Sequence, residues 1–369
     1  MKVKTITCHK VYNHGASLQE LALLKFLENE GHDAETIDYT PPYLSNHHNF
    51  FAVGNPRFEK NIFLKYAYLL LKLPGRLFML TRKKAFDDFE EKYIKSTQIN
   101  YKNNEELTRN LPEADVFICG SDQIWNSFFQ NGKDPAFYLD FVPAGIPKVS
   151  YAASFAIKKL EQEQESFVSE KVNRLDHISV RENSGKAILK DLGIERVTQV
   201  MDPVFLLEKE YWEDNFVEVM NQKFIFVYDC DSNSVIKDIA MQAAREFDLK
   251  IYTVNKNISY ATKNFYKVGP QKFLSLIHSA QFVISNSFHA VAFSLIFNKK
   301  FYVVDRSENI NTRMRDIMKV MGLEDMHLQY GEYRECKDIV IDYTRVNEIV
   351  SKEVDRSIAF LNSAVLQKP

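Results

Sequence analysis

The sequence predicts an α/β protein made of two doubly wound Rossmann-like domains that face each other across a cleft. Short apolar, β-branched runs alternate with helical patterns along the whole chain, which is typical of parallel sheets covered by helices. The 369 residues are enough for two hydrophobic cores. We expect an N-terminal domain at 1–210, a C-terminal domain at 211–345 and a helix at 346–369 that packs back on the first domain.

The first domain opens with a strand at 3–8, a helix at 17–31 that Gly31 closes, and a strand at 34–39. Such a βαβ unit implies a parallel sheet, because the helix carries the chain back to the same edge. The remaining predicted elements alternate in the same way: helix 85–96, strands 115–120 and 148–154, helix 158–173, strand 177–181, helix 182–192 and strand 197–203.

The second domain repeats this alternation from about Tyr211 onward. Its predicted elements are strand 223–230, helix 235–247, strand 250–255, helix 270–280, strand 281–285, helix 290–297 and strand 301–305. Two such domains in series place the carboxyl ends of both sheets at one cleft, which is where open α/β sheets bind ligands.

Composition excludes several classes of function. The 47 Lys and Arg residues nearly balance the 49 Asp and Glu residues, so we expect no nucleic-acid partner. The four cysteines, Cys8, Cys119, Cys230 and Cys336, form no C-x-x-C pair, which disfavours zinc and disulfides alike. The N-terminus lacks the apolar region of a signal peptide, and we therefore expect a cytoplasmic protein.

Residues 60–86 are unusual because they combine a dense set of apolar residues with seven basic and no acidic ones. Charged residues and Pro74 interrupt the segment too often for a membrane span. Two interpretations stay open. The segment is either a pair of helices that cover the core, or a basic amphipathic segment, at 60–84, that lies in the headgroup region of an anionic membrane.

A histidine stands at a predicted turn between a strand and a helix, in the run Asn286-Ser287-Phe288-His289. Asn and Ser are good helix N-caps, and the free N–H groups of a first helical turn attract phosphate or carboxylate. The alternative is a histidine that only caps or packs. On this turn alone, both interpretations stay open.

Other predicted strand ends also carry polar residues. Arg181 follows a strand and suits a bidentate grip on an anion, unless it is a surface arginine paired with Glu182. Gly120 permits a tight turn, Asp122 offers a carboxylate, and Trp125 offers either a flat face for a sugar or a buried core side chain.

Familiar nucleotide and hydrolase motifs are missing from the sequence. The first βα turn, at 13–19, contains one glycine but lacks G-x-G-x-x-G, which disfavours a dinucleotide. The chain also has no P-loop, no H-E-x-x-H and no G-x-S-x-G pattern. Asp229 and Asp231 pair two carboxylates after a strand, and we interpret them as solvated turn residues rather than as a cation site.

Seven motifs in order resemble the polysaccharide pyruvyl transferase family: NHGASLQELAL, GSDQIWN, SYAASF, SVREN, MDPVFLL, the long run from Gly269 to Phe301, and NTRMRDIMKVMGL. The resemblance extends from Asn13 to Leu323. It implies a glycosyltransferase B-like fold and an enzyme that moves pyruvate from phosphoenolpyruvate onto a sugar as a ketal. The acceptor would be a sugar of a cell-surface polysaccharide, such as a capsule or exopolysaccharide, or its lipid-linked precursor at the inner face of the membrane.

The resemblance also assigns residues. The family's essential histidine and arginine fall on His289 and Arg181, and we expect Asp122 to orient or deprotonate an acceptor hydroxyl. The expected substrate-binding residues are Asn13, Gly15, Gly120, Ser121, Trp125, Asn286, Ser287, Phe288, Arg313 and Arg315. We expect neither a metal ion nor a cofactor, with phosphoenolpyruvate as the donor substrate.

One motif departs from the family, because relatives have Arg-Leu-His where this chain has Ser287-Phe288-His289. Arg313 or Arg315 would have to supply the missing cation. Two alternatives therefore stay open: a nucleotide-sugar-dependent glycosyltransferase of the same architecture, and a non-catalytic subunit of glycan assembly.

Overall fold

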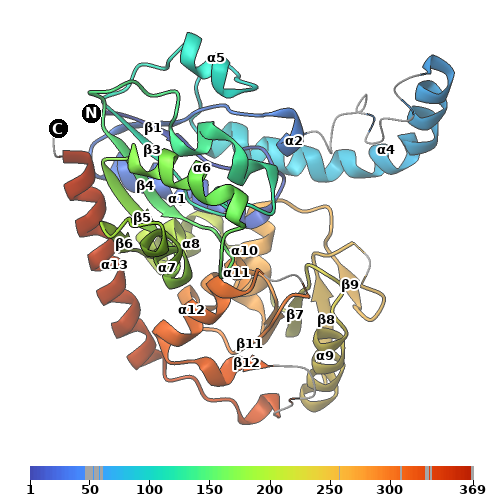
Figure 1. Ribbon diagram of the computed structural model, residues 1–369. Helices are drawn as coiled ribbons and strands as arrows, with labels where there is room; N and C mark the ends of the chain where they lie inside the picture. Colours follow the sequence, from blue (N-terminus) through green and yellow to red (C-terminus); the bar gives the residue numbers. More distant parts are fainter. Residues whose placement is uncertain are drawn as a thin grey trace.

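The chain forms two α/β lobes, shown in the computed structural model of Figure 1. The structure describes residues 1–45, 53, 58, 61–256, 258–307, 310–328, 332 and 335–366. Within this part of the chain each lobe contains one six-stranded parallel sheet with helices packed against it. The predicted fold class, two doubly wound Rossmann-like domains, is confirmed.

The first sheet has the strand order β2-β1-β3-β4-β5-β6. Its strands are β1 (Lys2–Ile6), β2 (Asp33–Thr36), β3 (Val116–Cys119), β4 (Lys148–Ala153), β5 (His177–Val180) and β6 (Val197–Gln199). Around it lie α1 (His14–Asn29), α2 (Pro42–Ser45), α5 (Asn104–Arg109), α6 (Gln162–Asn173), α7 (Asn183–Asp191) and the 3₁₀ helices η2 (Gln130–Lys133), η3 (Pro135–Tyr138) and η4 (Pro203–Leu206). Strands β3 and β4 are buried throughout, as strands covered on both faces are.

The second sheet has the order β12-β11-β10-β7-β8-β9. Its strands are β7 (Phe224–Tyr228), β8 (Lys250–Thr253), β9 (Lys263–Asn264), β10 (Phe282–Ser285), β11 (Phe301–Val304) and β12 (His327–Leu328). Its helices are α8 (Lys209–Phe216), α9 (Ser234–Phe247), α10 (Pro270–Ser279), α11 (Phe288–Ile296), α12 (Thr312–Met321) and the 3₁₀ helices η5 (Glu324–Met326) and η6 (Cys336–Asp338).

The strand order reverses between β1 and β3 in the first sheet and between β7 and β10 in the second. In open α/β sheets these reversal points leave a crevice at the carboxyl ends of the strands. Helix α1, which follows β1, packs against both α10 and α11 of the other lobe. The two crevices therefore meet at the start of α1.

Helix α1 begins three residues earlier than the sequence predicts. The side chain of Asn13 accepts hydrogen bonds from the backbone N–H groups of Gly15, at 2.9 Å, and Ala16, at 3.2 Å. This cap satisfies two of the donors that a helix N-terminus leaves open. The turn expected at 13–19 is thus the first turn of the helix.

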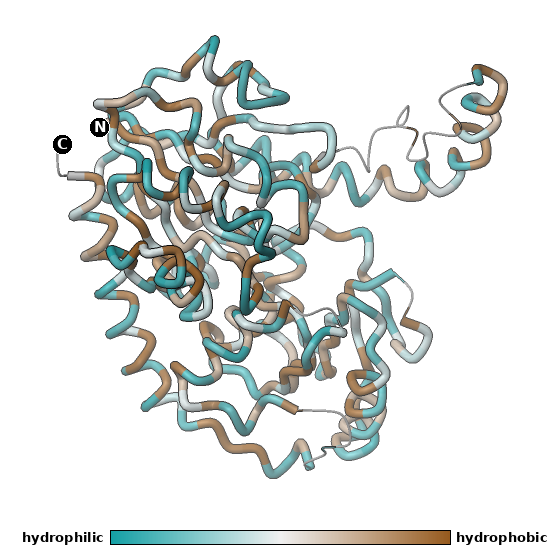
Figure 2. Tube along the Cα trace, viewed as in Figure 1, coloured by the Kyte–Doolittle hydropathy of each residue, from teal (hydrophilic) through white to brown (hydrophobic). Residues whose placement is uncertain are grey.

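The basic segment forms one helix, α4 (Ile62–Tyr93), which continues through Pro74. Our interpretation of a pair of helices that cover the core is wrong. Most side chains between residues 62 and 81 are exposed, and Figures 1 and 2 show this half of α4 extending away from the body as a mixture of apolar and polar residues. Buried side chains begin at Arg82, so only the second half packs on the lobes.

The last helix, α13 (Tyr343–Leu366), runs along both lobes in Figure 1. It contacts α12 of the second lobe and η4 and β4 of the first. The hydroxyl of Ser357 accepts a hydrogen bond of 2.9 Å from the backbone N–H of Met201. Among the described helices, none has a stretch long and apolar enough to cross a bilayer.

Candidate active site

The ends of the two sheets bring four of the predicted residues together. Arg181 follows β5 and Asp122 follows β3, while His289 lies in the first turn of α11 and Arg313 in the first turn of α12. One carboxylate oxygen of Asp122 accepts from both Arg181 and Arg313, each at 3.3 Å. The side chains of both arginines are almost fully buried, so the surface ion pair that we considered for Arg181 is wrong.

A residue that the sequence analysis missed, Asp202, connects this group. Its Oδ2 accepts a hydrogen bond from Arg181 and lies 3.6 Å from His289 Nε2 and 3.4 Å from the hydroxyl of Ser121. Its Oδ1 caps η4 by accepting from the N–H of Val204. The signal was available, because Asp202 stands just after β6 and so at the same edge of the sheet as Arg181.

The charged side chains of the group shift one another's pKa values. Burial opposes ionisation of Asp202, but its contacts with His289 and Arg181 hold its pKa well below the usual range. Burial likewise opposes ionisation of Asp122, yet the charge of Arg181 lowers its pKa. Burial and the charge of Arg181 lower the pKa of Arg313 to about 10, so two buried guanidinium groups repel each other here.

Several polar atoms in this group have no hydrogen-bond partner among the described residues. They are Arg181 Nε, Arg313 Nε and His289 Nε2, all buried. Both guanidinium groups also lie over the ring of Phe288, at 4.5 Å for Arg181 and 5.7 Å for Arg313. Buried donors are normally satisfied, so unused ones beside an aromatic wall indicate space for an acceptor that carries negative charge.

The glycine of α1 makes room for the histidine. A Cβ atom added to Gly15 would lie 2.0 Å from His289 Nδ1. No real Cβ comes so close to another heavy atom, and therefore Gly15 must lack a side chain for His289 to occupy this position. We expected Gly15 and Asn13 to bind substrate; the structure uses Gly15 to seat His289 and the side chain of Asn13 to cap α1.

The turn after β3 is held in a similar way. The hydroxyl of Ser121 donates to Ala152 O at 2.9 Å, and its N–H donates to the side chain of Gln19 at 3.1 Å. A Cβ at Gly120 would lie 2.1 Å from Tyr151 O. These two residues place Asp122, whose carboxylate faces the arginines.

Two expected substrate contacts are corrected by the structure. Trp125 is 0% exposed, stacks on Tyr138 and donates to Phe137 O, so it offers no face to a sugar. The side-chain oxygen of Asn286 accepts from Cys230 N, and its NH₂ donates to Asp231, which ties it to the turn after β7.

Ser287 is the N-cap residue of α11 but makes no side-chain capping bond, and its N–H donates to Ser285 Oγ. Asp229, expected as a solvated turn residue, is instead buried and accepts from the backbone N–H groups of Asp231 and Asn233. The interpretation of Asp229 as a solvated residue is therefore wrong, whereas Ser287 stays a predicted substrate contact.

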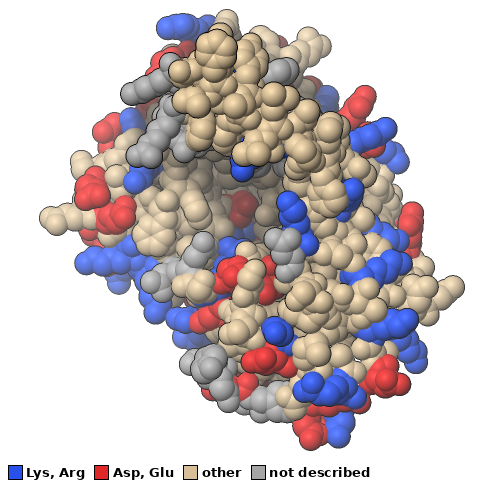
Figure 3. All heavy atoms as spheres, turned by 90° about the vertical axis from the view of Figure 1, so that its right-hand side faces the viewer, with Lys and Arg blue, Asp and Glu red and all other residues tan. Residues whose placement is uncertain are grey.

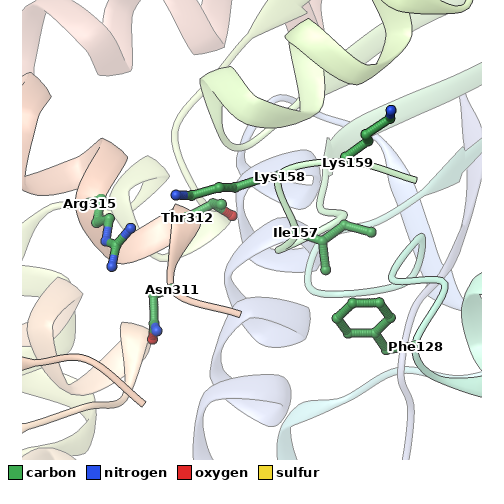
Figure 4. Close-up of a pocket in the computed structure, with 7 residues that line it drawn as sticks. All are labelled: Phe128, Ile157, Lys158, Lys159, Asn311, Thr312 and Arg315. Atoms are coloured by element: carbon green, nitrogen blue, oxygen red, sulfur yellow. The ribbon is translucent and has the colours of Figure 1, made fainter. Parts of the chain in front are cut away.

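Two cavities border the group. One, of about 360 Å³, is lined by Arg181, Asp202, Phe288 and Arg313 among others. The other, of about 390 Å³, opens between the lobes next to Arg313, and Figure 4 shows its lining residues. In Figure 3 a hollow lies between the lobes, with acidic atoms deep inside it and basic atoms at its edges.

The two candidates for the missing cation have different surroundings. Arg313 is buried and contacts Asp122 beside Arg181, whereas Arg315 is exposed and pairs with Asp305. Arg313 is therefore the arginine that joins the histidine group, while Arg315 lines the cavity of Figure 4.

A second polar cluster lies outside this group, where β1, α1 and α4 meet. His9 Nδ1 is 2.7 Å from Glu20 and 3.7 Å from Glu90, and the other ring nitrogen is 3.5 Å from Asp38. The donor atoms of His9, Glu20 and Glu90 lie within 4.8 Å of one another, close enough to hold a metal ion. Ser17 donates to Glu90 at 3.2 Å, so the cluster also has partners of its own.

The raised pKa values of Glu90 and His9 in this cluster predict that the free energy of unfolding falls as pH rises. Burial and the charge of Glu20 raise the pKa of Glu90 from 4.5 to about 8. Burial lowers the pKa of His9, but Glu20 and Asp38 raise it overall, from 6.5 to about 10. Both groups hold protons in the folded state that the unfolded chain has released, so the free energy of unfolding should decrease through these two pH ranges.

Glu90→Gln should weaken this decrease between pH 4.5 and 8, because the amide cannot ionise. Thermal unfolding followed by circular dichroism across the range measures it. The exposed neighbour Glu91 provides the control, since Glu91→Gln should leave the wild-type profile unchanged. A Glu90→Gln profile as steep as that of the wild type would contradict the raised pKa.

Solved structures with the same architecture share little sequence with the chain. Arabidopsis thaliana UGT89C1 complexed with quercetin is 10% identical with a TM-score of 0.50, over 99% of this chain and 98% of that one. UDP-GlcNAc 2-epimerase from Neisseria meningitidis bound to UDP-GlcNAc is 12% identical with a TM-score of 0.46, over 100% and 95% of the two chains. The likeness to the first of these structures shows the fold alone. No curated protein matches the chain significantly.

The sequence itself matches a family model. The matched region, residues 13–308, begins at the cap of α1 and includes Asp122, Arg181, Asp202 and His289. It covers most of both lobes and the strand ends that carry these four residues. Of the predicted site residues, Arg313 and Arg315 lie beyond it. The chain belongs to the polysaccharide pyruvyl transferase family.

Proposed function

We propose that this protein transfers pyruvate from phosphoenolpyruvate to two hydroxyl groups of a sugar, forming a ketal. The observation that carries the proposal is the pair of buried Nε atoms, on Arg181 and Arg313, that lack a hydrogen-bond partner among the described residues. Phosphoenolpyruvate carries a carboxylate and a phosphate, and guanidinium groups bind both with paired hydrogen bonds. The cavity of about 360 Å³ that Arg181 and Arg313 line is ample for so small a molecule.

Ketal formation requires that the methylene carbon of phosphoenolpyruvate takes up a proton and becomes a methyl group. Two sugar oxygens then bond to the neighbouring carbon, phosphate leaves, and the two hydroxyl protons are released. One of these protons balances the one that was taken up, and the other leaves with phosphate or solvent. No oxidant or reductant is needed.

The residues of the site match these steps. The imidazole of His289 can deliver and accept a proton, and the carboxylate of Asp202 lies 3.6 Å from its Nε2. Arg181 and Arg313 would hold the charged groups of the donor. Asp122 is favoured as a carboxylate, so it can accept a hydrogen bond from a sugar hydroxyl and orient it.

Measurement of phosphate release tests this proposal against the two alternatives, a glycosyltransferase and a non-catalytic subunit. Incubation with phosphoenolpyruvate and a candidate glycan should release phosphate and add a pyruvyl group to the glycan by mass spectrometry. Phosphoenolpyruvate should also raise the unfolding temperature. Protection by a nucleotide sugar instead would favour a glycosyltransferase, and neither protection nor turnover would favour a non-catalytic subunit.

We further propose that the acceptor is lipid-linked and that α4 brings the enzyme to the membrane. Phe63 is 82% and Leu71 79% exposed, within a set of exposed apolar side chains: Ile62, Phe63, Leu64, Tyr66, Leu70, Leu71, Leu73, Leu77, Phe78 and Leu80. Lys65 and Lys72 are exposed among them, and no acidic residue occurs between 60 and 86. A basic, apolar helix that extends from the body suits an anionic bilayer surface.

The boundary of this membrane segment needs a correction. Arg82 is buried and donates to the backbone oxygens of Tyr266, at 2.7 Å, and Tyr12, at 3.0 Å. It therefore joins α4 to both lobes rather than to lipid. Lys60 lies outside the described residues. The exposed part runs from Ile62 to about Leu80.

Replacing Lys65, Lys72 and Arg76 by Gln should strongly reduce binding to anionic vesicles, because each basic residue near such a surface contributes about 1 kcal/mol. Co-sedimentation at low and high salt measures the binding. Activity on a short water-soluble acceptor should hardly change.

The matched control replaces three exposed lysines elsewhere, Lys223, Lys237 and Lys352, by Gln. This variant should bind vesicles like the wild type. If the wild type stays in the supernatant at low salt, the membrane proposal is wrong.

A further inference from the structure

The cavity of Figure 4 has a wall from each lobe. Phe128, Ile157, Lys158 and Lys159 come from the first lobe, and Asn311, Thr312 and Arg315 come from the second. Its lining contains three basic residues and no acidic one. The lining is thus basic, and its residue Thr312 directly precedes Arg313, whose guanidinium group contacts Asp122.

One buried hydroxyl in this pocket lacks a partner. Thr312 is 5% exposed, and its Oγ1 makes no hydrogen bond to any described residue. In Figure 4 it is drawn in the wall of the cavity beside the side chain of Lys158. A buried hydroxyl is rarely left unpaired, so its position in the wall of a cavity indicates a ligand with a hydrogen-bond acceptor.

The backbone at this point adds positive potential. Thr312 is the first residue of α12, a helix of 10 residues, and the N-cap residue Asn311 makes no side-chain capping bond. The N–H groups of a first helical turn and the helix dipole favour an anion there. This potential adds to the charges of the side chains.

Two basic side chains lie on the same side of the pocket. Figure 4 shows the side chain of Lys158 extending past Thr312 toward the side of Arg315, whereas Lys159 points away. Lys158 is exposed, so its ammonium group is accessible to an anion. Arg315 does pair with Asp305, but an arginine has five donors and keeps several for a ligand.

We propose that this pocket binds a phosphate group of the sugar acceptor, so that the acceptor is a phosphorylated glycan. The proposal rests on the proposed function, in which Arg181 and Arg313 hold the anionic donor a short way deeper between the lobes. Phe128 is half exposed in the same pocket and offers an aromatic face against which a sugar ring can lie. The acceptor hydroxyls would then point toward Asp122.

Inorganic pyrophosphate is the probe for the pocket, titrated by calorimetry into protein saturated with phosphoenolpyruvate. We expect the wild type to bind it and the double variant Lys158→Gln, Arg315→Gln to bind it about tenfold or more weakly, since charge-assisted hydrogen bonds are lost. Lys159→Gln should bind like the wild type, because its side chain points away. Equal affinity in the wild type and the double variant would overturn the proposal.

Competition between phosphoenolpyruvate and pyrophosphate shows whether the pocket binds the phosphate of the donor or that of the acceptor. If phosphoenolpyruvate displaces pyrophosphate from this pocket, the pocket is the donor site and the proposal is wrong. If phosphoenolpyruvate does not bind at all while pyrophosphate binding still depends on Lys158 and Arg315, the proposed function fails and the phosphate pocket stands.

A kinetic comparison then identifies the acceptor. The double variant should raise the KM for a phosphorylated glycan about tenfold or more and leave kcat largely unchanged, since the lost contacts hold the substrate rather than the reacting atoms. The same glycan after phosphatase treatment should be used equally well by the wild type and the variant. An equal rise in KM for the phosphorylated and the phosphatase-treated glycan would show that the pocket does not bind the phosphate group.

Discussion

His289→Asn should abolish turnover while the fold and most of the binding of phosphoenolpyruvate remain. Asparagine keeps a polar side chain in the space between Gly15 and Asp202 but cannot deliver a proton near neutral pH. Loss of a general acid or base typically lowers the rate on the order of a hundredfold or more. Phosphate release measures turnover, and the shift of unfolding temperature with phosphoenolpyruvate measures binding.

A second histidine provides the control for this variant. His278 lies on α10 and pairs with Glu213 at 3.0 Å, with no described contact to the candidate site. His278→Asn should retain activity. Near-native turnover of His289→Asn would remove this histidine from catalysis.

Arg181→Lys should weaken the binding of phosphoenolpyruvate by about 1.5–3 kcal/mol, as expected when a hydrogen bond to a charged group goes unmade. The guanidinium group contacts Asp202 and Asp122 with two nitrogens and still has Nε free. A lysine ammonium keeps the charge but cannot span both carboxylates and a ligand at once. Calorimetric titration measures the loss.

Arg174→Lys is the matched control, because Arg174 is partly exposed and contacts only Asp140 among the described residues. Its affinity for phosphoenolpyruvate should equal that of the wild type. Unchanged affinity of Arg181→Lys would mean that Arg181 only joins Asp122 to Asp202 and does not bind the donor.

Local sequence was sufficient for much of the fold. The strands and most helices occur where periodicity places them, because alternating apolar runs and helical faces are properties of short segments. The sequence analysis missed the two-residue strands β9 and β12 and the helices α2, α5, α8 and α12, and it misplaced the ends of others. α1 begins at His14 because the side chain of Asn13 caps it, and α4 continues through Pro74 although proline usually ends a helix.

Part of the candidate site could also be predicted from local sequence. His289, Arg181 and Asp122 stand at strand ends, and parallel strands bring such ends to one edge of the sheet. The sequence did not show which of these side chains remain available to bind substrate. Trp125 is used by the core and Asn286 by a neighbouring turn, and both uses depend on partners far away in sequence.

The sequence by itself therefore determined two parallel sheets, the edge at which they bind ligands, and the histidine and arginine at that edge. Only the tertiary structure decided that Asp202 joins Arg181 to His289, and that Arg313 rather than Arg315 stands beside them. It also showed that Gly15, in the opposite lobe, leaves the space that the ring of His289 occupies. The physical reason is that periodicity fixes the face of a segment, whereas burial, ion pairs and close contacts depend on which segments meet.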